Sequence, residues 1–210
     1  EAAENLDMKL ISRDQDSISI ENSIEKIEEY DILANFPFSS ETKRMGIILQ
    51  NKETNNIVFY LKGADMVMVN MVSQAQRLTI QDYCDNFAKE GLRTLVITKK
   101  NLDQETFTEW RRRYDEASHA LTHRNQKMQK VVELLETNME LLGITAVEDK
   151  LQDNVAETLE NMKNAGIKVW MLTGDKLETA ITVSVSAGLK HPKQPMTVMK
   201  EVTDVAVARQ

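Results

Sequence analysis

Thr173, Gly174 and Asp175 form a short polar segment between an apolar run and a predicted helix. The run before them, Val169–Leu172, has the composition of a buried strand. Ligands of open α/β sheets bind beyond the carboxyl ends of the strands, where a hydroxyl, free N–H groups and a helix N-terminus suit a phosphate. A connecting turn in which Asp175 caps the helix is the simpler interpretation of the segment by itself, and the phosphate site is the other.

A second carboxylate, Asp149, follows the predicted strand Leu142–Val147. If the two strands are neighbours in a parallel sheet, Asp149 and Asp175 reach the same sheet edge. Two carboxylates there suggest a Mg²⁺ ion or a shared phosphate site. A pair of helix caps is the alternative.

Two cationic side chains stand beside glycines at strand ends. Lys62 follows the apolar run Ile57–Leu61 and precedes Gly63, and Arg93 opens a second apolar strand just after Gly91. A lysine beside a glycine can approach a nucleotide closely, and an arginine can hold phosphate oxygens bidentately. A solvated lysine and a structural, partnered arginine remain the alternatives.

An aromatic side chain precedes a basic pair in the segment Phe36-Pro37-Phe38-Ser39-Ser40. Phe38 beside Lys43 and Arg44 could stack a purine, an interaction worth roughly 1–3 kcal/mol per base. The other interpretation places Phe38 in the core.

The pattern of apolar residues predicts strands that position these side chains. Lys9–Ser12 with Ser17–Ile20, and Met45–Gln50 with Ile57–Leu61, should form hairpins, the second around the polar turn Asn51–Asn56. Further strands are expected at Glu29–Asn35 and Leu92–Thr98.

The last third has a β-α-β-α rhythm typical of a parallel sheet. We expect strands at Leu142–Val147 and Ile167–Leu172, and helices at Asn154–Ala165 and Leu177–Ala187. The fold class is therefore α/β, with an antiparallel-sheet domain over 1–141 and a partial parallel-sheet domain over 142–210. An incomplete parallel sheet leaves an edge unpaired, so the second domain should be the less stable.

Helix signals fall between these strands. Thr79 with Asp82 resembles an N-terminal cap, and Asp103 should cap a charged helix that reaches about Ala120. A helix after it should run to about Leu141, because apolar residues recur there at three- and four-residue steps. Those residues, expected in the core, are Met128, Val132, Leu135, Met139 and Leu142.

Composition narrows the class of protein. The formal net charge is −7 over 210 residues, which argues against nucleic-acid binding. The single cysteine, Cys84, permits no internal disulfide and is expected to be a small buried hydrophobe. No apolar run approaches the roughly 18 residues of a membrane span. These features predict a cytosolic segment.

Taken together, the order of the motifs resembles that of the P-type ATPases across essentially the whole chain. They are Phe38-Ser39-Ser40-Glu41-Thr42-Lys43-Arg44-Met45, Lys62-Gly63-Ala64-Asp65, Gly91-Leu92-Arg93-Thr94-Leu95, Glu148-Asp149-Lys150-Leu151-Gln152 and Met171-Leu172-Thr173-Gly174-Asp175-Lys176. The Asp-Lys-Leu-Gln motif resembles that of the phospholipid-flippase class. The sequences around Leu10–Asp14 and Trp170–Glu178 are similar to those of its monomeric Golgi and endosomal branch.

The resemblance implies a role for each matching residue. Phe38 would stack adenine, with Ser39 and Lys43 near the nucleotide, Lys62 lining the adenine pocket and Arg93 on the polyphosphate. Thr173, Gly174 and Asp175 would meet the γ-phosphate, with Asp149 in support. The implied fold is a nucleotide-binding domain joined to a haloacid-dehalogenase-type phosphorylation domain, and the implied ligands are ATP and Mg²⁺.

The resemblance also implies what should lie outside residues 1–210. The Asp-Lys-Thr-Gly-Thr segment with the phosphorylated aspartate would precede them, and a Mg²⁺-holding Gly-Asp-Gly-X-Asn-Asp segment would follow. The whole enzyme would flip phospholipid across a membrane by way of an aspartyl phosphate. This chain is expected to bind ATP without taking its phosphate.

Three other interpretations remain. A fragment of a cation-transporting P-type ATPase is disfavoured by the sequence of the motif Asp149–Gln152. A free-standing haloacid-dehalogenase phosphatase would need an Asp-X-Asp nucleophile motif at the end of a first parallel strand; the triplet Asp14-Gln15-Asp16 has that spacing but falls in the turn of a predicted hairpin. A non-catalytic interaction module could use the charged helices within Asp103–Leu141 as a docking face.

Overall fold

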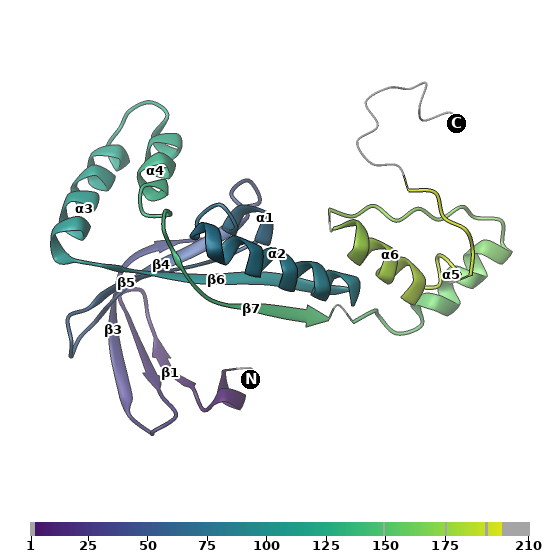
Figure 1. The fold of residues 1–210 in the computed structure, drawn as a ribbon, viewed down its shortest axis with the longest axis horizontal. Helices are drawn as coiled ribbons and strands as arrows, with labels where there is room; N and C mark the ends of the chain where they lie inside the picture. Colours follow the sequence, from purple (N-terminus) through teal and green to yellow (C-terminus); the bar gives the residue numbers. More distant parts are fainter. Residues whose placement is uncertain (1–2, 149, 175, 192, 199–210) are drawn as a thin grey trace. The chain divides into compact units, whose positions relative to one another are not determined.

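The computed structural model describes residues 3–148, 150–174, 176–191 and 193–198. The chain forms two compact units (Figure 1). The first comprises Glu1–Phe87 and Arg93–Val147, and the second comprises Ala88–Leu92 and Glu148–Gln210. Each unit is described by itself.

A seven-stranded sheet with its strands in sequence order builds the first unit. The ladders from β1 to β6 are all antiparallel. The strands are β1 (Lys9–Arg13), β2 (Ser17–Glu21), β3 (Ile27–Phe36), β4 (Arg44–Asn51), β5 (Ile57–Gly63), β6 (Leu92–Leu102) and β7 (Glu140–Glu148). Every strand predicted between Lys9 and Thr98 is confirmed, as are both predicted hairpins.

The hairpin turns are closed by their own side chains. In the β4–β5 turn, the Asn51 Oδ1 atom accepts hydrogen bonds from the Glu53 and Thr54 amides at 2.9 and 2.8 Å. In the β1–β2 turn, Asp14 Oδ1 accepts from the Asp16 and Ser17 amides, and these bonds lower the pKa of Asp14. Turns of this kind fix the register of the strands they join.

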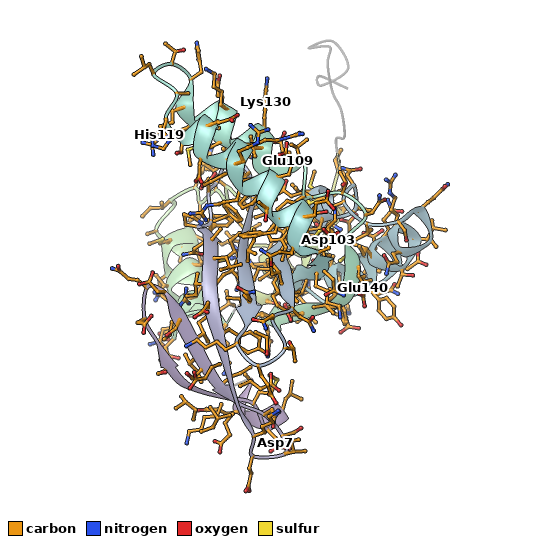
Figure 2. The ribbon with its side chains drawn as sticks, turned by 90° about the vertical axis from the view of Figure 1, so that its left-hand side faces the viewer. Asp7, Asp103, Glu109, His119, Lys130 and Glu140 are labelled. Carbon is orange, nitrogen blue, oxygen red and sulfur yellow. The ribbon has the colours of Figure 1, made fainter. Side chains whose placement is uncertain are left out.

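The helices follow one of the two expected N-terminal cap signals. They are a 3₁₀ turn η1 (Glu4–Leu6), then α1 (Asp65–Met68), α2 (Gln74–Lys89), α3 (Gln104–Ser118), α4 (Arg124–Glu133), α5 (Val155–Asn164) and α6 (Leu177–Ser186). Asp103 caps α3 as predicted, since its carboxylate accepts from the Thr106 amide at 2.7 Å and the Thr106 hydroxyl at 3.0 Å. Figure 2 shows Asp103 and His119 at opposite ends of α3.

The predicted cap at Thr79 is wrong, because α2 begins five residues earlier, at Gln74. Thr79 therefore lies inside the helix. The carbonyl oxygen of Ser73 accepts the first hydrogen bonds of this helix, from the Gln76 and Arg77 amides.

The core lies between one face of the central strands and the helices. Ile48, Phe59 and Val96 are fully buried on that face, and Ile80 and Cys84 cover them from α2. Cys84 is thus the buried hydrophobe that was predicted.

Aromatic side chains continue this core toward α3. Phe36 meets Phe59, Trp110 and Tyr114 edge to face, with ring centroids 5.9–6.0 Å apart. The Trp110 indole N–H donates to the carbonyl of Val131 at 3.1 Å. The interaction fastens α3 to α4.

The helix predicted to reach Leu141 is wrong in its length, since α4 ends at Glu133. Lys100 Nζ donates to the Leu135 and Thr137 carbonyls at 3.1 and 2.8 Å, so those groups bond to a side chain instead of a further helical turn. Burial lowers the pKa of Lys100. Most of the predicted apolar stripe is nevertheless internal; Leu142 is exposed.

The second unit contains α5 and α6 and, within its described residues, no strand. The glycines Gly91, Gly166 and Gly188 follow α2, α5 and α6 and have positive φ values of 81°, 77° and 74°, the left-handed conformation in which a glycine ends a helix. No helix in the described part of the chain has both the length and the apolar composition needed to cross a membrane.

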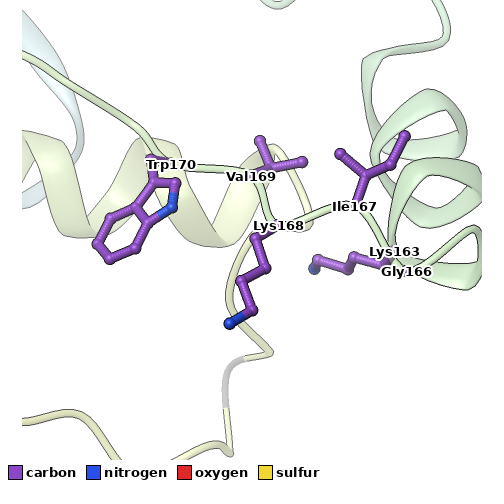
Figure 3. A pocket seen from close by; sticks show the side chains of 6 residues that line it. All are labelled: Lys163, Gly166, Ile167, Lys168, Val169 and Trp170. Atoms are coloured by element: carbon purple, nitrogen blue, oxygen red, sulfur yellow. The ribbon is translucent and has the colours of Figure 1, made fainter.

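The strand predicted at Ile167–Leu172 is not formed, and the predicted strand at Leu142–Val147 belongs to the sheet of the first unit as β7. The expected parallel β-α-β-α sheet is therefore wrong for the described residues. Figure 3 shows residues 167–170 of this segment extended, with Ile167 and Val169 on one side of the chain and Lys168 and Trp170 on the other. A strand needs a neighbouring strand to pair its backbone groups, and the described residues of this unit include no such strand beside it.

Candidate functional site

A pocket of about 170 Å³ lies on the sheet face opposite the core. The register places Met45 opposite Lys62 and Lys62 opposite Ile97, so one cation stands between two apolar side chains. A second cation, Arg13, also lines the pocket, together with Asn35, Met45, Ile47, Tyr60 and Ile97. Apolar walls with few polar groups are typical of small-molecule sites.

The alternation of β5 explains why Lys62 faces this pocket. Leu61 and Gly63 are buried, and Lys62 between them is exposed. Because successive residues of a strand point to opposite faces, the core contacts of Leu61 direct Lys62 to the open face. This placement fits a ligand-binding lysine.

The loop between β3 and β4 carries Phe38, whose surface is 61% exposed. The interpretation of Phe38 as a core residue is therefore wrong, and Phe36, two positions earlier, fills that role. Ser39 closes the loop: its hydroxyl accepts from the Thr42 amide at 3.1 Å and its carbonyl accepts from the Lys43 amide at 2.8 Å. Ser39 thus shapes the loop that presents Phe38.

Close backbone approach brings the Lys43 segment beside the Lys62 segment. Arg44 pairs with Gly63, and the Ala64 amide donates to the Lys43 carbonyl at 3.1 Å. A Cβ atom on Gly63 would lie 2.7 Å from Arg44 Cβ and 2.8 Å from the Lys43 oxygen. Only glycine permits this approach, which unites two predicted nucleotide-binding segments.

Arg93 lies near the start of β6 and is exposed. Strand alternation places it on the same face as Ile97, the residue opposite Lys62. Ile97 lies four residue steps after Arg93, roughly 13 Å along the strand at 3.3–3.4 Å per residue. A ligand that reaches both Lys62 and Arg93 must therefore be elongated.

The remaining predicted site residues belong to the second unit. Thr173 and Gly174 are exposed on an irregular segment that precedes α6. Asp149 and Asp175 lie outside the described residues. Among the residues that are described, no three His, Cys, Asp or Glu side chains are grouped so as to hold a metal ion.

Sequence reasoning missed the apolar walls of the pocket. Met45 and Ile47 lie in a predicted strand, and the predicted hairpin register would have placed Met45 opposite Lys62. The alternation of β4 and β5 was therefore a usable signal. The sequence also contained no indication of the ion pair between Arg44 and Glu136, because the two residues are 92 positions apart and no local pattern connects them.

A family model described as P-type ATPase, cytoplasmic domain N, matches residues 3–154. The chain belongs to the P-type ATPases. The matched residues include the sheet, the pocket and the Phe38 loop, so the antiparallel architecture of the first unit is that of a P-type ATPase N domain.

Curated relatives match most of this chain. A protein named probable phospholipid-transporting ATPase IIB from Danio rerio is 46% identical over 201 residues, covering 96% of this chain and 18% of the relative. Phospholipid-transporting ATPase NEO1 from Saccharomyces cerevisiae is 43% identical, covering 95% and 17%. Phospholipid-transporting ATPase IC from Homo sapiens is 40% identical, covering 90% and 15%. The chain thus spans less than a fifth of the length of these relatives.

Proposed function

We propose that this chain is the ATP-binding cytosolic part of a phospholipid-transporting P-type ATPase. The observation that carries the proposal is the pocket in which Lys62 stands between apolar side chains, on the face that also bears Arg93. A flat apolar base fits the pocket walls, and an attached polyphosphate fits a cation further along the same face. The names of the relatives favour phospholipid over a cation as the transported substrate.

Each residue then has a defined task. Phe38 stacks on adenine from the exposed loop, Lys43 and Lys62 surround the base, and Arg93 binds the phosphates; Ser39 holds the loop in shape. Phe38 suits its role because an exposed aromatic ring can stack with little rearrangement.

The second part of the chain completes the proposal. Because β7 belongs to the sheet of the first unit, we assign the residues after β7, up to 210, to the phosphorylation domain of the whole enzyme, where Thr173, Gly174 and Asp175 would meet the γ-phosphate of ATP·Mg²⁺ with Asp149 in support. The whole enzyme would use the aspartyl phosphate to move phospholipid across a Golgi or endosomal membrane, with this chain on the cytosolic side. A backbone N–H at a glycine and a neighbouring hydroxyl are suitable donors to a phosphate.

The structure offers less support for an interaction module built on α3. Glu109 accepts hydrogen bonds from Arg112 and Arg113 at 2.9 and 2.7 Å, and these bonds lower its pKa to about 2. Figure 2 shows Glu109 on this helix. Charges already paired within one helix leave little single-sign field for docking a partner.

Calorimetric titration with ATP, ADP and adenosine tests the proposal. Phe38→Ala is expected to weaken ATP and ADP binding about equally, by roughly 1–3 kcal/mol, because it removes the stacking surface. Leu121→Ala removes a fully exposed apolar side chain elsewhere and should leave both affinities unchanged. Unaltered affinity of the Phe38 variant would remove Phe38 from the site.

Arg93 is expected to act on the phosphates. Arg93→Lys keeps the charge and loses the planar fork of donors, so it should weaken ADP binding far more than adenosine binding. Equal losses for the two ligands would show that Arg93 has a structural role instead.

A further inference from the structure

A buried ion pair joins the start of β4 to the connection between α4 and β7. Arg44 Nε lies 2.7 Å from Glu136 Oε1, and Arg44 Nη2 lies 2.6 Å from Oε2. The two side chains are only 11% and 4% exposed. This is the bidentate arrangement in which an arginine fixes both distance and orientation.

Stability alone gives a weak reason for such a pair. Removing two charges from water costs about as much as their attraction returns, and apolar side chains of similar volume often stabilise a core equally well. Unlike an apolar contact, the ion pair also fixes the orientation of its two side chains. The residues whose positions depend on that orientation therefore indicate what the pair does.

On one side, Glu136 is held by a connection that is itself anchored. Lys100 Nζ donates to the carbonyls of Leu135 and Thr137, the residues on either side of Glu136. The Met139 amide donates to the Met71 carbonyl at 2.8 Å. Glu136 thus presents its carboxylate from a firm support.

On the other side, Arg44 ends the loop that carries Phe38. Its Nη1 atom donates to the Thr42 carbonyl at 3.2 Å, which ties the loop backbone to the ion pair. Lys43, between these two residues, has a φ of 53°, a left-handed conformation that a lysine adopts only when its surroundings impose it. Because strand residues alternate, seating Arg44 inward also directs Met45 into the pocket.

We propose that the Arg44–Glu136 pair is a positioning device that holds the Phe38–Lys43 loop in its nucleotide-binding conformation without touching the nucleotide. The proposal rests on the proposed function, since it assumes that the loop binds the base of ATP. In this role Arg44 and Glu136 orient the loop through their bidentate contact. For the stability of the fold, apolar side chains of similar volume would be sufficient.

The decisive variant replaces both partners, as Arg44→Met with Glu136→Leu. Two apolar side chains leave no unpaired buried charge, so the melting temperature should stay close to that of the parent chain. The Kd values for ATP, ADP and adenosine should all rise by a common factor of about ten, because ligand binding must then order the loop. Hydrogen exchange at the Thr42 and Lys43 amides, which bond to Ser39, should be faster.

Two further variants guard the test against misfolding. Arg44→Lys keeps the charge and loses the bidentate geometry, and it should show the same loss in smaller measure. Glu53→Gln breaks the exposed Lys26–Glu53 pair and should change neither affinity nor exchange, because exposed pairs contribute little.

The possible outcomes separate the two proposals. A folded double variant with unchanged Kd values and unchanged Thr42 and Lys43 exchange would overturn the positioning role. If the parent chain binds no ATP, the proposed function fails; faster exchange in the double variant would then still support the control of the loop by the ion pair, and unchanged exchange would refute it.

Discussion

Strand β5 and the segment Ile167–Leu172 have similar apolar composition and opposite fates. In β5, Ile57, Phe59 and Leu61 are buried. In the second segment, Trp170 and Leu172 are 83% and 94% exposed. Both segments are extended, and only the first belongs to a sheet.

The difference lies in the neighbours that each segment finds. β5 is hydrogen-bonded to β4 and to β6 along its whole length, and helices cover the face that bears Phe59. The other segment has no strand beside it among the described residues of its unit. Apolar alternation therefore identifies a segment able to form a strand, and partners decide whether it does.

The largest expected difference between these segments is in amide hydrogen exchange. The Ile48 and Phe59 amides lie in the centre of the sheet and should exchange only on global unfolding, whereas those of Val169 and Leu172 should exchange almost freely. For a domain of ordinary stability the rates should differ by about four orders of magnitude. Comparable protection of the two segments would show that 167–172 is paired after all.

A matched pair of truncations should show a smaller difference in stability. Phe59→Ala removes a fully buried ring that Phe36 contacts, and should cost about 3–5 kcal/mol. Leu172→Ala removes an exposed side chain and should change the free energy of unfolding by less than about 0.5 kcal/mol. Urea denaturation measures both, and a large loss from Leu172→Ala would reveal packing that the exposure does not.

The smallest expected effect is on the pH dependence of stability, and it arises from the Tyr30 hydroxyl in the first unit. Burial, aided by the hydrogen bond that its hydroxyl donates to Glu28, raises the pKa of Tyr30 to about 12. The unfolded value is roughly 10. The protonated form is therefore favoured by folding, and its stabilisation is complete below about pH 10 and lost as the pH rises to about 12.

Tyr30→Phe removes the hydroxyl group whose pKa differs between the folded and unfolded chains. The parent chain should lose urea resistance between about pH 10 and pH 12 more steeply than the variant does. Parallel losses for both proteins would show that Tyr30 titrates alike in the folded and unfolded chains.

Local chemistry allowed much of the fold to be predicted. The turn residues Asp14 and Asn51, and the cap residue Asp103, act within three residues of themselves, so their effect is visible in any short window of sequence. The alternation of β4 and β5 is equally local. It fixed which residues face the core and therefore that Lys62 faces away from it.

The candidate site was predicted in its residues more than in its shape. Motif order singled out Phe38, Lys43, Lys62 and Arg93, and the structure places all four in the first unit. The apolar pocket around Lys62 depends on the register of three strands at once. That register cannot be predicted from any one segment alone, although the predicted β4–β5 hairpin implied part of it.

The hairpins and the capped helix α3 could be predicted from the sequence, because these elements satisfy their own hydrogen bonds. The end of α4, the pairing of Arg44 with Glu136 and the irregular conformation of Ile167–Leu172 depend on the folded chain. In each of these cases the deciding partner lies far away along the chain, or is lacking among the described residues of the unit. The physical reason is that backbone and charged groups take whichever partners the assembled fold offers, and a local pattern of residues does not record them.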